Sequence, residues 1–157
     1  MSASHWILDK VQRSLRAYLQ SQSFTWVASA DIVAGIHRPA QENPDLEQEV
    51  HSVPWVGCVC QEAEATALHS GEWKATAKVH LNCSASDKTD DEFHAMCSDL
   101  MNALVSTTIA ADLSASLADF RAEQVNMQGQ SWSIEGRRWV AELTMEIYCL
   151  GADIPDS

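Results

Sequence analysis

The sequence predicts an α+β fold, a mainly antiparallel sheet flanked by helices on one face, in two layers. Two long segments alternate apolar and polar residues with a period of two, as strands with one solvated face do. Three other segments repeat apolar residues at helical spacing. Short turn-forming stretches separate consecutive strands, which favours antiparallel pairing, and helices stacked on such a sheet form a second layer.

Length and charge limit the classes of function. The 157 residues fit one domain spanning 1–157, and a hydrophobic fraction of 46% is enough for a core. The net charge of -12 argues against general nucleic-acid binding and against anionic membranes. No apolar run approaches the roughly 20 residues of a membrane helix, and no secretion signal is seen. Five cysteines without an export signal suggest reduced thiols in the cytoplasm.

The first third of the chain predicts a helix, a strand and a loop. Apolar residues at helical spacing predict a helix over His5–Gln20, with Ser4 as its N-cap. Residues that favour strands dominate Phe24–Ile36, which we expect to form the first strand. The segment 38–52 has no period and several carboxylates, so we expect a long acidic loop, and loops of that length are usually functional or disordered.

The middle of the chain predicts two strands and two helices. The strands are Trp55–Glu64, apolar on both faces at first, and Trp73–Cys83, whose odd-numbered residues face inward. Thr89 and Glu92 have the spacing of a capping box that opens a helix. A second, short helix is predicted over Thr107–Leu117.

The last third predicts a hairpin arm between two strands. Asp119–Met127 forms a weaker strand, and glycine-marked turns then delimit a projecting hairpin arm over 128–136. Arg137–Cys149 is the most regular strand, and 151–157 is predicted to be a flexible tail. The inward face of the last strand is expected to hold Trp139, Ala141, Leu143, Met145, Ile147 and Cys149.

No sequence motif indicates chemistry. The nucleophile elbow, the phosphate-binding loops and the zinc-protease motif are all absent from the sequence. The acidic clusters at 42–49 and 87–92 lack the spacing of a calcium loop, and a solvated loop and a helix start explain them. We therefore predict no enzyme, no catalytic residue, no cofactor and no metal.

A small metal- or ligand-binding domain is the alternative from a different class. Cys58 and Cys60 lie on one face of a predicted strand, and His94 and Cys97 lie on one face of a predicted helix. Four such ligands would suit zinc. Buried structural thiols are the competing interpretation of the same cysteines.

Apolar residues on the arm indicate a protein interface. Trp132 and Ile134 lie between glycine-marked turns, so we expect them to pack against a partner, although folding back over the sheet is the alternative. Arg137 and Arg138 precede a tryptophan, as in interface hot spots, or simply begin a strand with solvated charge. The acidic loop adds three further interface candidates, Glu42, Asp45 and Glu47.

The order of these elements resembles a known family. A leading helix precedes WVASADIVAGI, a charged loop, VPWVGCVCQEAEAT and WKATAKVHLNC. TDDEFHAMCSDLMNAL, a short helix rich in Ala and Leu, and SIEGRRWVAELTMEIYCL follow. Over nearly the whole chain, this order resembles the tail-terminator (tail completion, or neck) proteins of tailed bacteriophages.

The resemblance implies a structural role in the virion. Tail terminators form a ring, usually a hexamer, which stops polymerisation of the tail tube and presents a surface to the head–tail connector. Loop 38–52 and arm 128–136 would be the contact elements, and no catalytic residue is implied. DNA would only pass through the acidic lumen, and the protein would move from the host cytoplasm into the tail or neck. Another head–tail joining or neck protein is the nearest alternative.

Overall fold

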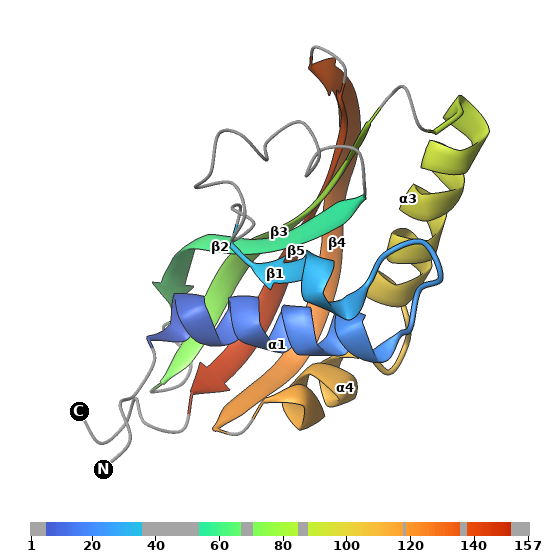
Figure 1. Ribbon diagram of the computed structural model, residues 1–157. Coiled ribbons are helices and arrows are strands. Elements are labelled where there is room, and N and C mark those ends of the chain that lie inside the picture. The colour runs from blue at the N-terminus through green and yellow to red at the C-terminus, as the bar shows by residue number, and fades with distance from the viewer. Residues whose placement is uncertain are drawn as a thin grey trace, which may run out of the picture.

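The computed structural model describes residues 6–35, 54–66, 71–84, 88–117, 119–135 and 138–151. One five-stranded sheet is combined with helices, so the predicted α+β class is confirmed (Figure 1). The elements in chain order are α1 (Ile7–Ser21), a 3-10 turn (Ser29–Asp31), β1 (Ile32–Ala34), β2 (Trp55–Ala65), β3 (Glu72–Ser84), α3 (Asp90–Leu104), α4 (Ile109–Ser116), β4 (Phe120–Glu135) and β5 (Arg138–Gly151).

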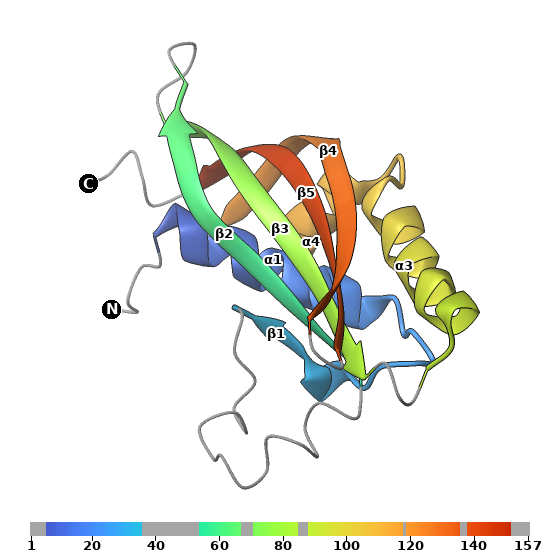
Figure 2. The ribbon, with the colours of Figure 1, turned by 90° about the horizontal axis from the view of Figure 1, so that it is seen from above.

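The sheet is mixed, with the strand order β1-β2-β3-β5-β4. The β2–β3, β3–β5 and β4–β5 pairs are antiparallel, whereas the short β1 runs parallel to β2. Helices α1 and α4 lie against one face of the sheet, and α3 stands beside its β4 end (Figure 2). Strand β1 therefore lies at one edge of the sheet and β4 at the other.

Helix α1 packs one apolar stripe on the sheet. Val11, Leu15 and Leu19 recur at helical spacing and are fully buried. The helix begins at Ile7 after Trp6, which makes no side-chain cap, and the predicted N-cap Ser4 lies outside the described residues.

The predicted strand over Phe24–Ile36 is mostly wrong, since among its described residues, 24–35, only Ile32–Ala34 forms a strand. Residues 24–31 instead form turns, in which the rings of Phe24 and Trp26 stack with centroids 5.1 Å apart. Residues with strand propensity here serve aromatic packing, because context overrides a weak backbone preference. Loop 38–52 lies outside the described residues.

Strands β3 and β5 follow the predicted alternation. The inward side chains are buried on both strands except for Trp73, which is half-buried, while the opposite face is half-buried along its middle and carries cross-strand ion pairs. Lys74 and Glu146 approach to 3.6 Å, and Lys78 and Glu142 to 3.4 Å. The buried inward set comprises Ala75, Ala77, Val79, Leu81, Cys83, Trp139, Ala141, Leu143, Met145, Ile147 and Cys149.

Strand β4 differs from the prediction of a short strand followed by a separate arm. It runs without a break from Phe120 to Glu135 and pairs with β5 throughout. The residues around Gly129, which were predicted to form a turn, form a β-bulge instead. The register with β5 shifts there, between Met127 and Gly129. A glycine inside a strand often marks such a bulge rather than a turn.

Helices α3 and α4 form close to their predicted positions. The capping box is present: Glu92 N–H donates to Thr89 Oγ1 at 3.2 Å, and Thr89 N–H donates to Glu92 Oε1 at 2.9 Å. The second helix, α4, spans Ile109–Ser116 rather than 107–117.

Candidate interaction surface

Two large apolar side chains lie uncovered at one end of β4. Trp132 is 54% exposed and Ile134 is 57% exposed. Their register partners on β5 are Ala141 and Trp139, which belong to the buried, helix-side face of the sheet. The apolar face of the sheet therefore continues past its cover of helices and reaches solvent at the β4 edge.

Helix α3 forms the far wall beside these residues. The Phe93 ring lies edge-on to Trp139, with centroids 4.8 Å apart, and to Trp132 at 6.1 Å. The His94 ring also meets Trp132 edge-on at 5.5 Å. A groove of about 280 Å³ lies between the helix and the sheet, lined by His94, Cys97, Gln130, Ser131, Trp132, Ala141, Glu142 and Leu143.

The sequence allowed two interpretations of Trp132: contact with a partner, or folding back over the sheet. One side of its ring folds back on α3, while more than half of the side chain faces solvent. Ile134 has the larger exposed fraction and lies nearer the end of the strand. The two residues together are available for contact with another molecule.

The outer edge of β4 is protected along its first half only. Ala122 N–H donates to the Ser114 hydroxyl of α4 at 2.9 Å. The Ser114 proton is shared between the Ala110 carbonyl at 2.8 Å and the Ala122 carbonyl at 3.2 Å. Arg121 and Glu123 add charge there, and a bulge separates Ala122 from Gln124. All of these features are known to blunt a sheet edge.

The second half of the same edge begins at the bulge between Met127 and Gly129, and among the described residues it has no helix contact of the Ser114 kind and no charged side chain over 128–134. Residues 128–134 read Gln-Gly-Gln-Ser-Trp-Ser-Ile, without a charge or a proline, and all seven are exposed. No described strand or helix pairs with their outer side. A long, exposed and uncharged edge strand is a template for pairing with another chain.

Of the other predicted interface residues, only Arg138 is described, and it does not join this surface. Arg138 is half-buried and precedes Trp139 on β5, so it lies on the face opposite Ile134. Arg137, Glu42, Asp45 and Glu47 lie outside the described residues.

The cysteines and His94 of the metal hypothesis are not brought together. Cys58 and Cys60 are buried on β2, where burial raises the pKa of each thiol to about 12. Cys97 is on α3, and burial raises its pKa to about 11, while His94 is exposed beside Trp132. No group of three or more potential ligands forms among the residues that the structure describes. The thiols therefore have the character of packing residues.

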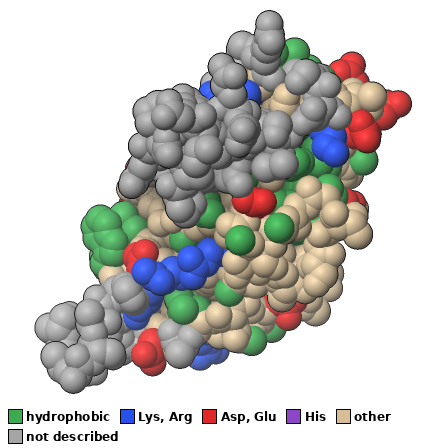
Figure 3. Space-filling model, viewed as in Figure 1, with side chains coloured by type: hydrophobic (Ala, Val, Ile, Leu, Met, Phe, Trp, Pro, Cys, Tyr) green, Lys and Arg blue, Asp and Glu red, His purple; other side chains and the backbone are tan. Residues whose placement is uncertain are grey.

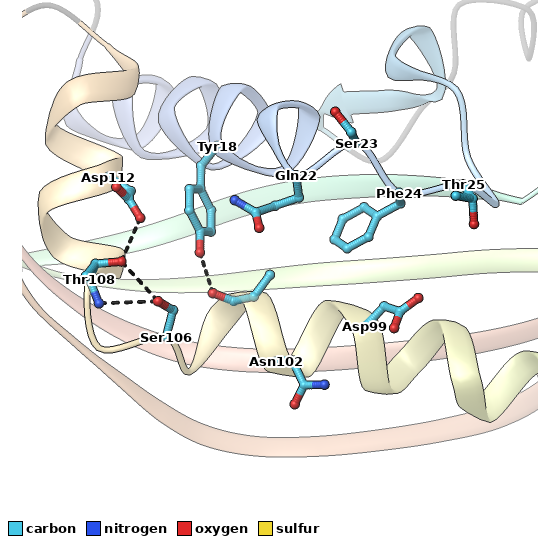
Figure 4. Close-up of a pocket in the computed structure, with 11 residues that line it drawn as sticks. Tyr18, Gln22, Ser23, Phe24, Thr25, Asp99, Asn102, Ser106, Thr108 and Asp112 are labelled. Atoms are coloured by element: carbon cyan, nitrogen blue, oxygen red, sulfur yellow. Dashed lines mark hydrogen bonds between the residues drawn. The ribbon is translucent and has the colours of Figure 1, made fainter.

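A polar cleft of about 560 Å³ lies elsewhere, at the junction of the three helices (Figure 4). Tyr18 of α1 points across it and donates to the Ala103 carbonyl of α3 at 2.5 Å. Thr108 donates to Asp112 at 2.9 Å. Asp99 accepts from Trp26 Nε1 at 2.9 Å. Sequence reasoning missed this cleft because its lining comes from segments far apart in the chain.

The hydrogen bonds of the cleft are those of a structural junction. Its two carboxylates are both engaged by neighbouring donors, and its lining residues include no histidine, cysteine or lysine. Burial, followed by the nearby Asp112 carboxylate, raises the pKa of Tyr18, so this hydroxyl stays a donor. Hydrogen bonds at the cleft join α1 to α3 through Tyr18, and the 24–31 segment to α3 through Trp26.

Comparison with known proteins adds no relative. No family model matches the chain, and no curated protein matches it. Among the described helices, none is long and apolar enough to cross a membrane. The function is therefore argued from the surface itself.

Proposed function

We propose that this protein is a structural virion subunit of the tail-terminator kind, which forms a ring that ends tail-tube polymerisation and joins the tail to the head connector. The observation that carries this proposal is the pair Trp132 and Ile134, exposed on an uncharged strand edge. Its partners would be other copies of itself, six in a ring as the resemblance implies, together with the tube protein and a connector or neck protein.

The energetics of the exposed pair support a role in assembly. Burying a large apolar side chain is worth about 1.5–3 kcal/mol relative to leaving it exposed. Tryptophan is also among the residues most enriched at energetic hot spots of interfaces. Trp132 and Ile134 lie two residues apart on the same side of a strand, so one partner surface covers both.

The fold and the charge are compatible with the proposed ring. Helices in one layer over a mainly antiparallel sheet are the arrangement expected of a tail terminator. The net charge of -12 suits a lumen through which DNA passes without sticking. The same surface would serve another head–tail joining protein, because that function also acts through protein contacts.

The oligomeric state tests the proposal. We expect sedimentation velocity of the purified protein to show a concentration-dependent species of several copies, and negative-stain images to show rings. The measurement is repeated with purified tail-tube particles, to which the rings should attach at one end. A protein that remains monomeric at high concentration, both alone and with tubes, would contradict the ring. Rings that attach to a connector but not to tubes would favour a neck protein.

A further inference from the structure

We infer that the polar cleft at the junction of α1, α3 and α4 binds an arginine side chain of a different protein, with Asp99 as the carboxylate that receives it and Phe24 as the ring beside it. The inference goes beyond the proposed function, because no residue that lines this cleft also lines the groove at Trp132. Three features of the cleft carry it: its unneutralised charge, its aromatic ring and its size.

The carboxylates of the cleft have neutral hydrogen-bond partners. Asp99 accepts from the indole N–H of Trp26 at 2.9 Å, and Asp112 accepts from the Thr108 hydroxyl at 2.9 Å. Within the part of the chain that the structure describes, neither carboxylate forms an ion pair, and the residues that line the cleft include no Lys, Arg or His. Both negative charges are therefore available to a cation from outside the chain.

The basic residues of α1 are directed away from the cleft. Lys10 donates to a backbone carbonyl at 3.2 Å, and Arg13 pairs with Asp9 at 2.6 Å. Arg16 lies two residues before Tyr18, and helix positions two apart do not face each other. Lys and Arg side chains gather along α1 near its start (Figure 3), whereas the cleft is lined by residues near its end.

The other described basic residues belong to the sheet or to the far end of α3. They are Lys74 and Lys78 on β3, Lys88 before α3, Arg121 on β4 and Arg138 on β5. Lys74 and Lys78 pair with glutamates on the sheet face opposite the helices. Lys88 stands before the start of α3, whereas the second half of that helix lines the cleft. None of the five lines the cleft, so its charge has no internal counterpart among the described residues.

An aromatic pair next to Asp99 selects arginine as the cation. The rings of Phe24 and Trp26 stack with centroids 5.1 Å apart, and the Trp26 indole bonds to the Asp99 carboxylate. Phe24 lines the cleft together with Asp99 (Figure 4). A planar guanidinium can donate N–H groups to a carboxylate while its face lies on a ring, whereas an ammonium group has no flat face.

The size and the rim of the cleft suit a side chain that a protein presents. The volume of about 560 Å³ lies within the range of ligand sites, about 300–1,000 Å³. Gln22, Ser23, Thr25 and Asn102 add exposed polar groups that can contact the backbone beside an inserted side chain. A different protein is the favoured source, because two copies of a chain with net charge -12 repel each other.

Fluorine NMR of the full chain labelled with fluorotryptophan tests the inference, because Trp26 contacts Asp99. The Trp26→Phe variant assigns the Trp26 signal among the six tryptophans. The probe is capped arginine, N-acetyl-arginine methylamide, and its uncharged match is capped citrulline. Asp99→Asn removes the charge but keeps an oxygen acceptor for the indole. Asp91→Asn is the matched control, because Asp91 is also exposed on α3 but does not line the cleft.

We expect capped arginine to shift the Trp26 signal saturably and capped citrulline to leave it in place. Asp99→Asn should weaken binding about fivefold and Phe24→Leu about threefold, whereas Asp91→Asn should change it by less than about twofold. The inference is overturned if arginine and citrulline bind alike, or if Asp91→Asn weakens binding as much as Asp99→Asn does.

Two further arms distinguish other sources of the cation. Spermidine that shifts the Trp26 signal where capped arginine does not would make a free polyamine the ligand, and would overturn the inference. A Trp26 signal that moves with protein concentration alone, without any probe, would make a second copy the source and would overturn it as well. Ring formation is measured separately by sedimentation, so failure of the proposed function leaves this test intact.

Discussion

The two halves of β4 pair with the same neighbour and yet have opposite environments. In the first half, Phe120 and Ala122 are buried, and α4 closes the outer edge through Ser114. In the second half, Trp132 and Ile134 continue the same apolar face into solvent. The difference shows that apolar alternation along a strand reports the face of a sheet, whereas the cover of that face comes from elsewhere in the chain or from a partner.

The largest effect is expected in the covered part of the sheet, from Leu143→Ala on β5. Leu143 is 2% exposed, so truncation should leave a cavity and cost about 2–5 kcal/mol of the free energy of unfolding. Urea denaturation measures this cost, with Ile134→Ala as the matched control on the open half. If both variants lose the same stability, the two halves do not differ as described.

The closure of the first half is tested next, by Ser114→Ala. The change leaves the Ala122 N–H near a methyl group, and an unsatisfied buried donor costs about 1–3 kcal/mol. The midpoint of urea unfolding should fall, whereas Ser131→Ala, on the open half of β4, should leave it in place. Equal midpoints for the two variants would mean that α4 does not seal the edge.

The wall of the open half depends on the helix cap at Thr89. Thr89→Ala removes the side-chain acceptor for the Glu92 N–H and should cost about 0.5–2 kcal/mol. Far-ultraviolet circular dichroism during thermal unfolding measures the loss, and Thr107→Ala, at an exposed position after α3, serves as the control. A loss as large with Thr107→Ala would show that the cap has no special role.

Sequence reasoning predicted the elements whose signals are local. The alternation of β3 and β5, and the Thr89–Glu92 capping box, depend on residues close together in the chain, and all three form as expected. The errors arose where the same residues are compatible with two kinds of local structure. Gly129 signals a turn but sits beside a bulge, and residues 24–31 have strand propensity but form turns.

The candidate surface was predictable in its residues but not in its form. Trp132 and Ile134 stand out in the sequence as large apolar residues between turn signals. Their place on a continuous strand edge depends on β4 pairing with β5 over its whole length. The contact of Trp132 with Phe93 and the closure of the edge by Ser114 depend on helix packing across the fold, for which a local pattern carries no signal.

The smallest effect on stability, and the most telling one, is expected from Trp132→Ala. The side chain is more than half exposed, and its edge-on contacts with Phe93 and His94 are worth about 0.5–1.5 kcal/mol at most. We therefore expect a loss of unfolding free energy below about 1.5 kcal/mol, together with a clear loss of assembly by sedimentation and pull-down with the tube partner. Because Leu143 lies on the same face only one strand away, the two variants differ chiefly in cover, not in position within the sheet. A stability loss equal to that of Leu143→Ala would place Trp132 in the core, and the open half of β4 would then be no surface for a partner.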